Sequence, residues 1–454
     1  MNRLGEYAAR IESSARRLGL TYSGVDFELV PERFMMETAV YGLPVRMPHW
    51  SFGVRYIRQL VQRNMGHSRI FEVMFPGDPC KAYLVDVNSL AENVLVVAHV
   101  LGHADFSQRN ALFQRSLAMA GGKILEQAAA RAHRIDAALH KHGQERVEAV
   151  LDAALALEAH VDVNRPLYRS PKGDARQDNG PVDDDPFRKR FETLPGEQAP
   201  AEPERRPPRQ VPPEPVYDLL WFIAHYGPDM EEWERDAFLA VREESFYFYP
   251  VFACQIMNEG WASYWHARLM REVEQLPSDV YVSAIKTHSD VVQPHAAGRT
   301  LALAVNPYHL GFSMWEQIVE QRGLEAARKI CAEEDDFGFV RNYLDQELAD
   351  RLELFVYEAS ADGSISVASR DIRAIREAIL APRFNFGVPR VAVTKLDVDG
   401  TLTLTHDHRS DGRGLDLKRA ERVLDYVVRV WRRPVVLQTV DEQGAQRTLN
   451  AKPH

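Results

Sequence analysis

A proline-rich, charged stretch in the middle of the chain limits where a packed core can form. Residues 166–215 contain twelve of the chain's 26 prolines, together with the acidic run at 183–185 and the basic run at 188–190. Such a segment cannot bury enough apolar surface to offset the conformational entropy that it loses on ordering. We therefore predict a linker or surface insertion over 166–215, with the folded parts on either side of it.

The sequences that flank this stretch have apolar residues at helical spacing. They predict one large helical domain in two parts, residues 1–165 and 216–389. Within the first part, "RIFEVMFP" and "CKAYLVDV" surround the turn "GDP" and predict a strand pair. Residues 390–454 predict a small α+β domain, with two strands around a turn at 399–400, then a helix and a last strand. The expected fold class is therefore mainly α-helical (α+β).

The composition is that of an ordinary soluble protein. Of the 454 residues, 45% are hydrophobic and 26% are charged, and the net charge of −10 argues against binding to nucleic acid or to an anionic membrane. No stretch of 18 apolar residues predicts a membrane span, and the N-terminal twenty residues lack the apolar core of a signal peptide. The three scattered cysteines suggest neither a disulfide framework nor a thiolate zinc site. We predict a cytoplasmic protein.

The stretch "VVAHVLGHADF" places two histidines, His99 and His103, four residues apart. On a helix, both rings leave the same face. This is the scaffold of the H-E-x-x-H zinc motif, in which the glutamate after the first histidine acts as a general base. Here Val100 occupies that position. The spacing therefore predicts a metal site whose base comes from elsewhere, or a site without catalysis.

A second segment, "MNEGWASYWH", offers further ligands. Glu259 and His266 lie seven residues apart, so a helix places them on one face, and the small residues Ala262 and Ser263 on it allow another helix to approach closely. Catalytic zinc sites often use two histidines, one glutamate and a water molecule. We therefore predict a zinc or other divalent transition-metal site with His99, His103 and Glu259. His266 is predicted as a fourth ligand or as a partner that orients one.

The base that Val100 does not supply needs another carboxylate. Our candidates for this catalytic role are Asp105, just beyond His103, and Glu244 in "VREESFYFYP". Other acids that remain open are Glu158, Asp162 and Glu243. This pattern predicts a metal-dependent hydrolase that has diverged from the H-E-x-x-H zinc peptidases.

Six segments in order give the sequence a family resemblance. They are "YGLPVRMPHWSFG", "AHVLGHADF", "REESFYF", "MNEGWASYWH", "NPYHLGF" and "VRNYLDQEL". Together they resemble the SpoVR-like (stage V sporulation protein R) family over nearly the whole chain. The resemblance implies a soluble, cytoplasmic bacterial protein. It also implies a role in formation of the spore cortex, or in stress responses where the bacterium does not sporulate.

The resemblance also implies partners, namely a PrkA-like serine protein kinase and a von Willebrand-A-like protein. It brings no catalytic residues, so the metal prediction rests on the residues alone. Two hypotheses follow. The first is a metal-dependent hydrolase of an amide or peptide bond. The second is a non-enzymatic regulatory or scaffold protein that acts with the kinase, with histidines that bind a structural metal or none.

Overall fold

The structure is a computed structural model that describes residues 2–64, 70–120, 123–165, 211–273, 276–292, 305–359 and 365–453. Of the linker predicted over 166–215, all but 211–215 lies outside these residues. Helices dominate and the sheets are small, which confirms the mainly α-helical (α+β) fold class. None of the described helices combines the length and the apolar character that crossing a membrane requires.

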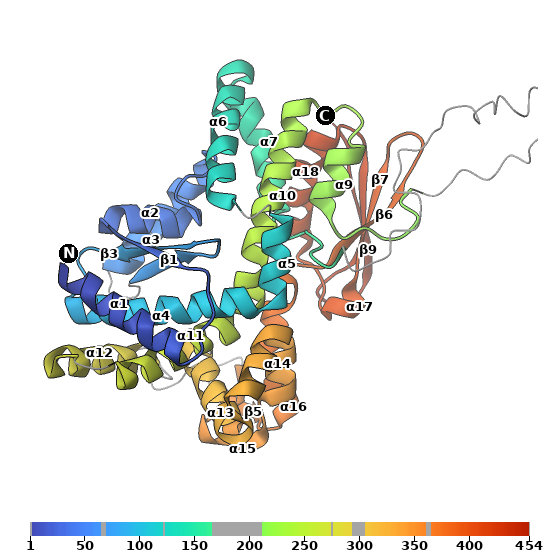
Figure 1. Ribbon diagram of the computed structural model, residues 1–454. Helices are drawn as coiled ribbons and strands as arrows, with labels where there is room; N and C mark the ends of the chain where they lie inside the picture. Colours follow the sequence, from blue (N-terminus) through green and yellow to red (C-terminus); the bar gives the residue numbers. More distant parts are fainter. Residues whose placement is uncertain are drawn as a thin grey trace, which may run out of the picture.

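The N-terminal part combines three helices with a small sheet (Figure 1). Its helices are α1 (Asn2–Arg17), α2 (Glu32–Tyr41) and α3 (Trp50–Asn64). Its strands are β1 (Val25–Val30), β2 (Glu72–Phe75) and β3 (Cys80–Val85), in the order β1–β3–β2. The antiparallel β2–β3 pair confirms the predicted strand pair. β1 joins it in parallel to β3, which a crossover through α2 and α3 allows.

Helix α4 (Leu90–Arg109) is the central element of the main core. Ser89 starts it with a capping box. The Ser89 hydroxyl accepts from the backbone N–H of Glu92 at 3.2 Å, and the Glu92 carboxylate accepts from the backbone N–H of Ser89 at 2.7 Å. From Val94 to Ser107 every residue is buried, because helices α1, α11 and α12 and the sheet surround α4.

Two further helices, α11 (Gln255–Glu272) and α13 (Pro307–Glu333), complete this core, with α12 (Ser278–Val291) beside α4. Their backbones approach closely where side chains are small. A Cβ atom on Gly102 of α4 would lie 2.7 Å from the Cα atom of Ala262 in α11. A Cβ atom on Gly260 would lie 2.3 Å from the backbone carbon of Gly311 in α13. This close packing holds α4 and α11 face to face.

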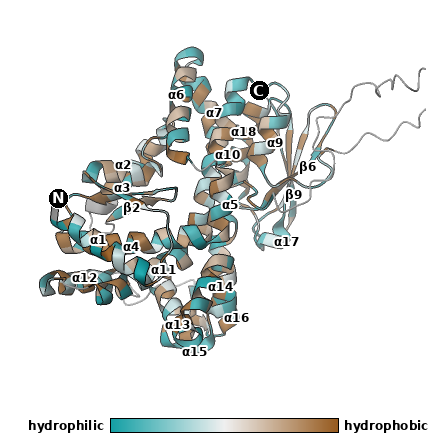
Figure 2. Ribbon diagram, in the orientation of Figure 1, coloured by the Kyte–Doolittle hydropathy of each residue, from teal (hydrophilic) through white to brown (hydrophobic). Residues whose placement is uncertain are grey.

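A second core joins the middle helices to the C-terminal sheet. The helices are α5 (Ala111–Met119), α6 (Ile124–His142), α7 (Gln144–Ala156), α9 (Leu219–Tyr226) and α10 (Glu232–Ala253). Helix α5 ends at Met119, shortly before two consecutive glycines in the sequence, and glycine is a poor helix former. Hydrophobic residues from α7, α9, α10 and the sheet form this core together (Figure 2).

The C-terminal sheet has the order β6–β7–β8–β9. Its elements are β6 (Val391–Leu396), β7 (Leu402–His406), α17 (His408–Asp411), α18 (Leu417–Trp431), β8 (Val435–Val440) and β9 (Gln446–Ala451). The antiparallel β6–β7 pair confirms the strands predicted around 399–400, and β9 is an additional strand. Val211 and Val216 pair with the outer edge of β6, so this sheet edge is covered.

A group of short elements follows α13 and lies beside it, with residues of its helices in the main core (Figure 1). They are α14 (Asp336–Tyr343), α15 (Gln346–Arg351), the hairpin of β4 (Val356–Ala359) and β5 (Ile365–Ser369), α16 (Ile372–Leu380) and the 3₁₀ segment η2 (Ala381–Gly387). Asp336 of α14 accepts hydrogen bonds from the backbone N–H groups of Ile256 and Met257, each at 2.9 Å. It thereby satisfies two of the free donors at the start of α11.

Candidate metal centre

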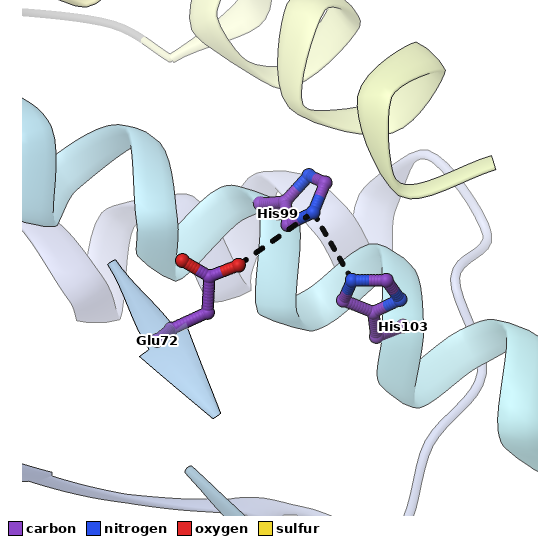
Figure 3. Close-up of side chains that lie close together, drawn as sticks. All are labelled: Glu72, His99 and His103. Atoms are coloured by element: carbon purple, nitrogen blue, oxygen red, sulfur yellow. Dashed lines mark hydrogen bonds and ion pairs between the residues drawn. The ribbon is translucent and has the colours of Figure 1, made fainter. Parts of the chain in front are cut away.

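The two histidines of α4 point to a common centre. Because His99 and His103 are one helical turn apart, their rings leave α4 on the same side, and their Nε2 atoms lie 3.0 Å apart. Figure 3 shows both imidazoles beside the end of strand β2. Their side chains are 7% and 10% exposed. The predicted face of α4 therefore carries two nitrogen ligands with almost no access to water.

Glu259 joins this pair from α11. Its Oε2 atom lies 3.6 Å from His99 Nε2 and 3.5 Å from His103 Nε2. The same oxygen is buried and has no hydrogen-bond partner among the described residues. Ligands bound tetrahedrally to Zn²⁺ at 2.0–2.1 Å lie about 3.3 Å from one another. The spacing of these three atoms is therefore close to that of a coordination shell.

Glu72, the first residue of β2, provides a second carboxylate (Figure 3). Its Oε1 atom lies 3.8 Å from His99 Nε2. One ligand atom each from Glu72, His99 and His103 fits within 4.8 Å of the others, which is a spacing that a metal ion can bridge. We call Glu72, His99, His103 and Glu259 the histidine–glutamate cluster. The two glutamate side chains are 18% and 21% exposed, so the cluster is most open on its carboxylate side.

The outer nitrogen of each imidazole is held by another side chain. His103 Nδ1 donates to the Asn258 side-chain oxygen at 2.8 Å, so in a neutral ring the lone pair of Nε2 faces the cluster. His99 Nδ1 lies 2.9 Å from His266 Nδ1, and His266 Nε2 lies 2.6 Å from His288 Nδ1 on α12. Metal-binding histidines are commonly fixed in this way, with the second ring nitrogen hydrogen-bonded outside the site.

Burial and charge set the protonation of the cluster. Burial, together with the neighbouring charge of His99, lowers the pKa of His103 to about 4. Burial alone would also lower the pKa of His99, but the contact with Glu259 and the charge of Glu72 outweigh it and raise that pKa. Burial opposes charge on Glu259, yet its contacts with His99 and His103 bring its pKa below the usual value. His99 and Glu259 thus form an ion pair beside a neutral His103.

Burial also raises the pKa of Glu72, with a further contribution from the negative charge of Glu259. Tyr308 of α13 lies next to Glu259, whose charge raises the pKa of the Tyr308 hydroxyl well above its usual value, so this hydroxyl stays protonated. Its ring stacks over that of His99, with centroids 6.3 Å apart. The site therefore has two carboxylates with different proton affinities and a neutral hydroxyl at its edge.

The structure brings three of the predicted ligands together and places the fourth outside them. His266 contacts the outer nitrogen of His99, on the opposite side of that ring from Nε2. Burial and the neighbouring His99 lower its pKa well below the usual value, so it is a neutral hydrogen-bond partner of His99. Of the two roles predicted for His266, the geometry supports the orienting one.

The two candidate bases have other partners. Asp105 accepts from the backbone N–H of Thr21 at 2.6 Å, from Arg109 Nε at 2.7 Å and from Trp261 Nε1 at 2.9 Å. Glu244 lies on α10 and accepts from Arg46 Nε at 2.6 Å. Neither carboxylate contacts His99 or His103 within the described part of the chain, so the geometry favours a structural role for both.

Sequence reasoning missed Glu72, Asn258 and Tyr308. Only Glu72 left a signal, as a single acid in the otherwise apolar strand "RIFEVMFP". Val100, at the position of the catalytic glutamate in H-E-x-x-H, is fully buried in the main core. A carboxylate at that position would point into apolar packing, so any general base at this site would have to come from another element.

Comparisons with known proteins agree with this architecture and define the class. A family model described as SpoVR like protein matches residues 1–387, and a model of the SpoVR-like C-terminal domain matches residues 389–442. The chain therefore belongs to the SpoVR family. It is 26% identical to the uncharacterized protein YcgB of Escherichia coli (strain K12) over 489 aligned residues, which cover 99% of this chain and 94% of the relative. No solved structure matches it.

Proposed function

We propose that this SpoVR-family protein is a metal-dependent hydrolase of amide or peptide bonds, with a divalent transition-metal ion held by His99, His103 and Glu259. One observation supports this proposal above the others. Two Nε2 atoms and the buried, otherwise unpartnered Oε2 atom of Glu259 converge at 3.0–3.6 Å. Buried polar atoms are normally paired, and a cation at their centre would satisfy all three.

In this proposal, Glu72 replaces the glutamate that H-E-x-x-H proteins have at the position of Val100. It is close enough to reach a water molecule in the centre, and burial raises the pKa of its carboxyl group. A general base works best when its pKa is close to the working pH. Glu72 would take a proton from the attacking water and pass it to the leaving nitrogen.

The metal would lower the pKa of the bound water and polarise the carbonyl group. The protein residues would then do the positioning. Asn258 and His266 hold the two imidazoles from outside. The neutral Tyr308 hydroxyl, which contacts Glu259, would donate a hydrogen bond to an oxygen that gains negative charge.

The first test is metal content. The full chain, purified without a histidine tag, is loaded with Zn²⁺, Mn²⁺ or Fe²⁺, desalted and analysed by mass spectrometry. We expect about one equivalent of one of these ions in the wild type and none in His103→Ala. If none of the three ions is retained, the proposal fails.

Hydrolysis is measured on a mixture of internally quenched peptides and on cross-linked peptidoglycan fragments. We expect cleavage that requires the retained metal and is lost in His103→Ala. A protein that keeps its metal but cleaves neither substrate would point to the alternative, a regulatory or scaffold protein with a structural metal. The role in cortex formation or stress response, and the kinase and von Willebrand-A-like partners, remain predictions from the family resemblance.

A further inference from the structure

A cavity lies apart from the histidine–glutamate cluster, between α2, the C-terminal half of α10 and η2. Its volume is about 620 Å³, within the range of sites for small molecules. None of its lining residues belongs to the cluster. Its aromatic lining residues are Tyr41, Phe248, Tyr249, Phe252 and Phe386, and its charged ones are Arg46, Arg55, Glu158 and Arg383.

The aromatic rings form one side of this cavity. The ring of Phe386 in η2 packs edge-on against Tyr249 and Phe252 of α10, with centroids 4.8 Å and 5.7 Å away. Phe252 is nevertheless 59% exposed, although an aromatic side chain gains most when it is buried. The rings therefore leave aromatic surface available to a ligand.

The backbone that presents Phe386 adopts an unusual conformation. Asn385 and Phe386 have φ values of 48° and 58°, and Gly387 follows with 73°. A bulky residue in the left-handed region is a genuine outlier, and it persists only where the surrounding structure fixes it. Glycine would occupy this position without strain, so the presence of phenylalanine indicates that its ring is needed here.

The charged side of the cavity consists of arginines and Glu158. Arg46 is buried, with its side chain 6% exposed; its Nε atom donates to Glu244 at 2.6 Å and its Nη1 atom to the backbone carbonyl of Tyr41 at 3.1 Å, which leaves Nη2. The carboxylate of Glu158 lies 3.8 Å from Arg46 Nη2 and 3.7 Å from Arg55 Nη2. Both separations exceed hydrogen-bond length. An anion that enters here therefore finds two guanidinium groups whose facing N–H groups Glu158 does not engage through hydrogen bonds.

We propose that this cavity is a binding site for a small planar aromatic anion, such as an aryl carboxylate or aryl phosphate. The aromatic part lies against Phe386, Tyr249 and Phe252. The anionic group accepts hydrogen bonds from Arg55 and Arg46, and Glu158 moves aside toward solvent. Guanidinium groups suit this task because their N–H groups match the oxygens of carboxylates and phosphates.

The test uses two fluorescent dyes with the full chain. One is 1-anilinonaphthalene-8-sulfonate, a planar aromatic anion, and the other is its neutral analogue N-phenyl-1-naphthylamine. We expect one saturable site that binds the anion at least about tenfold more tightly than the neutral dye, in line with one charge-assisted contact. Equal affinity for the two dyes, or no saturable site, would overturn the proposal.

Paired variants separate the aromatic from the charged contribution. Phe386→Gly removes the ring and suits the backbone, so we expect binding of both dyes to weaken about tenfold or more with little change in melting temperature. Phe384→Ala is the matched control, because Phe384 lies in the same segment but lines a neighbouring cavity. If Phe386→Gly binds the dyes as well as Phe384→Ala does, the aromatic site is wrong.

Arg55→Gln tests the charge. It should weaken binding of the anionic dye about tenfold and leave binding of the neutral dye unchanged, whereas Arg58→Gln on the same helix should change neither. An equal effect of the two arginine variants would contradict the proposal. A further variant, Ile57→Gln, tests whether the dyes bind to helix α3 instead. This helix has four exposed hydrophobic side chains, those of Trp50, Val54, Ile57 and Val61. Dye binding that is lost in Ile57→Gln but kept in Phe386→Gly would place the dye on α3 and overturn the proposal.

Discussion

Two of the buried clusters in the described part of the chain place histidine next to a carboxylate, and they differ in how their polar atoms are satisfied. In the C-terminal sheet, His406 Nε2 lies 2.7 Å from Asp411 Oδ2, and His406 Nδ1 lies 2.9 Å from Thr439 Oγ1. Asp411 also accepts from the backbone N–H groups of Arg390 and Arg413. We call His406, Asp411 and Thr439 the His406 cluster.

In the histidine–glutamate cluster, by contrast, Glu259 Oε2 is buried and has no hydrogen-bond partner among the described residues, although it lies 3.5–3.6 Å from two ring nitrogens that contact each other at 3.0 Å. A buried histidine whose carboxylate partner has both oxygens hydrogen-bonded, as in the His406 cluster, is sufficiently explained as a structural residue. A buried carboxylate oxygen without a partner, beside two converging ring nitrogens, is what the proposed metal site requires. This unpaired oxygen therefore distinguishes the two clusters where residue type does not.

The strongest test of this difference between the two clusters is to mutate one histidine in each of them. We expect His103→Ala to lose all bound metal. Added metal should then stabilise the wild type, by about 4 kcal/mol at a free concentration a thousand times Kd, but not this variant. Calorimetric melting with and without Zn²⁺ measures the effect.

His406→Ala should show the reverse pattern. It leaves Asp411 without its histidine partner, and removing one partner of a buried hydrogen bond typically costs about 1–3 kcal/mol of unfolding free energy. Its metal content should equal that of the wild type. Metal loss in His406→Ala, or metal retention in His103→Ala, would mean that the unpaired carboxylate oxygen does not identify the metal site.

The next largest effect concerns the role of Glu72. If it is the general base, Glu72→Gln should lower the rate of hydrolysis about 10²- to 10⁴-fold while metal content stays close to one equivalent. The matched control is Glu28→Gln, which alters an exposed carboxylate on β1 of the same sheet and should leave the rate unchanged. A Glu72→Gln variant that loses metal instead would make Glu72 a ligand.

A smaller effect should follow from removing an outer hydrogen bond. Asn258→Ala frees His103 Nδ1, and loss of such a partner typically costs 10- to 100-fold in metal affinity. Asn258→Asp keeps an acceptor oxygen and should bind metal nearly as well as the wild type. Titration calorimetry with Zn²⁺ compares the three proteins, and equal affinities would show that Asn258 does not orient the ring.

The sequence predicted the parts of this site that local periodicity determines. Four-residue spacing brought His99 and His103 to one side of α4. Small residues on α11 indicated its close contact with another helix, which Ala262 and Gly102 now make. The strand pair and the α+β character of the C-terminal part followed from alternation and turn residues. All of these are properties of single segments.

The features of the site and of the fold that the sequence did not predict depend on contacts between segments distant in the chain. Glu72 lies on a strand whose pairing with β3 places it beside α4, and no local pattern encodes that placement. His266 shares a helix face with Glu259, yet two turns of rise place it behind His99. The shared core of the C-terminal sheet with α7, α9 and α10 was likewise not evident, because each segment alone shows only that it has an apolar face.

The smallest effect tests another buried carboxyl group, which accepts two backbone hydrogen bonds and has one arginine beside it. Both oxygens of Asp336 accept backbone N–H groups of α11, while Arg383 stays 3.6 Å away. Burial raises the pKa of Asp336 from 3.8 to about 7 despite these hydrogen bonds. Between pH 3.8 and about pH 7, Asp336 is protonated in the folded state but has lost its proton in the unfolded state. The free energy of unfolding therefore falls as pH rises through this interval.

Asp336→Asn should remove this dependence of the free energy of unfolding on pH. The stability advantage of the wild type over the variant should therefore shrink by up to about 1.4 kcal/mol per pH unit between pH 4 and 7, and stay constant above that interval. Urea unfolding of both proteins at several pH values measures this stability difference. A difference that stays the same between pH 4 and 7 would contradict the raised pKa of Asp336. The result would also sharpen the comparison of the clusters. It would show that burial of Asp336 outweighs two backbone hydrogen bonds and a nearby arginine, whereas the contacts of Glu259 with His99 and His103 outweigh its burial.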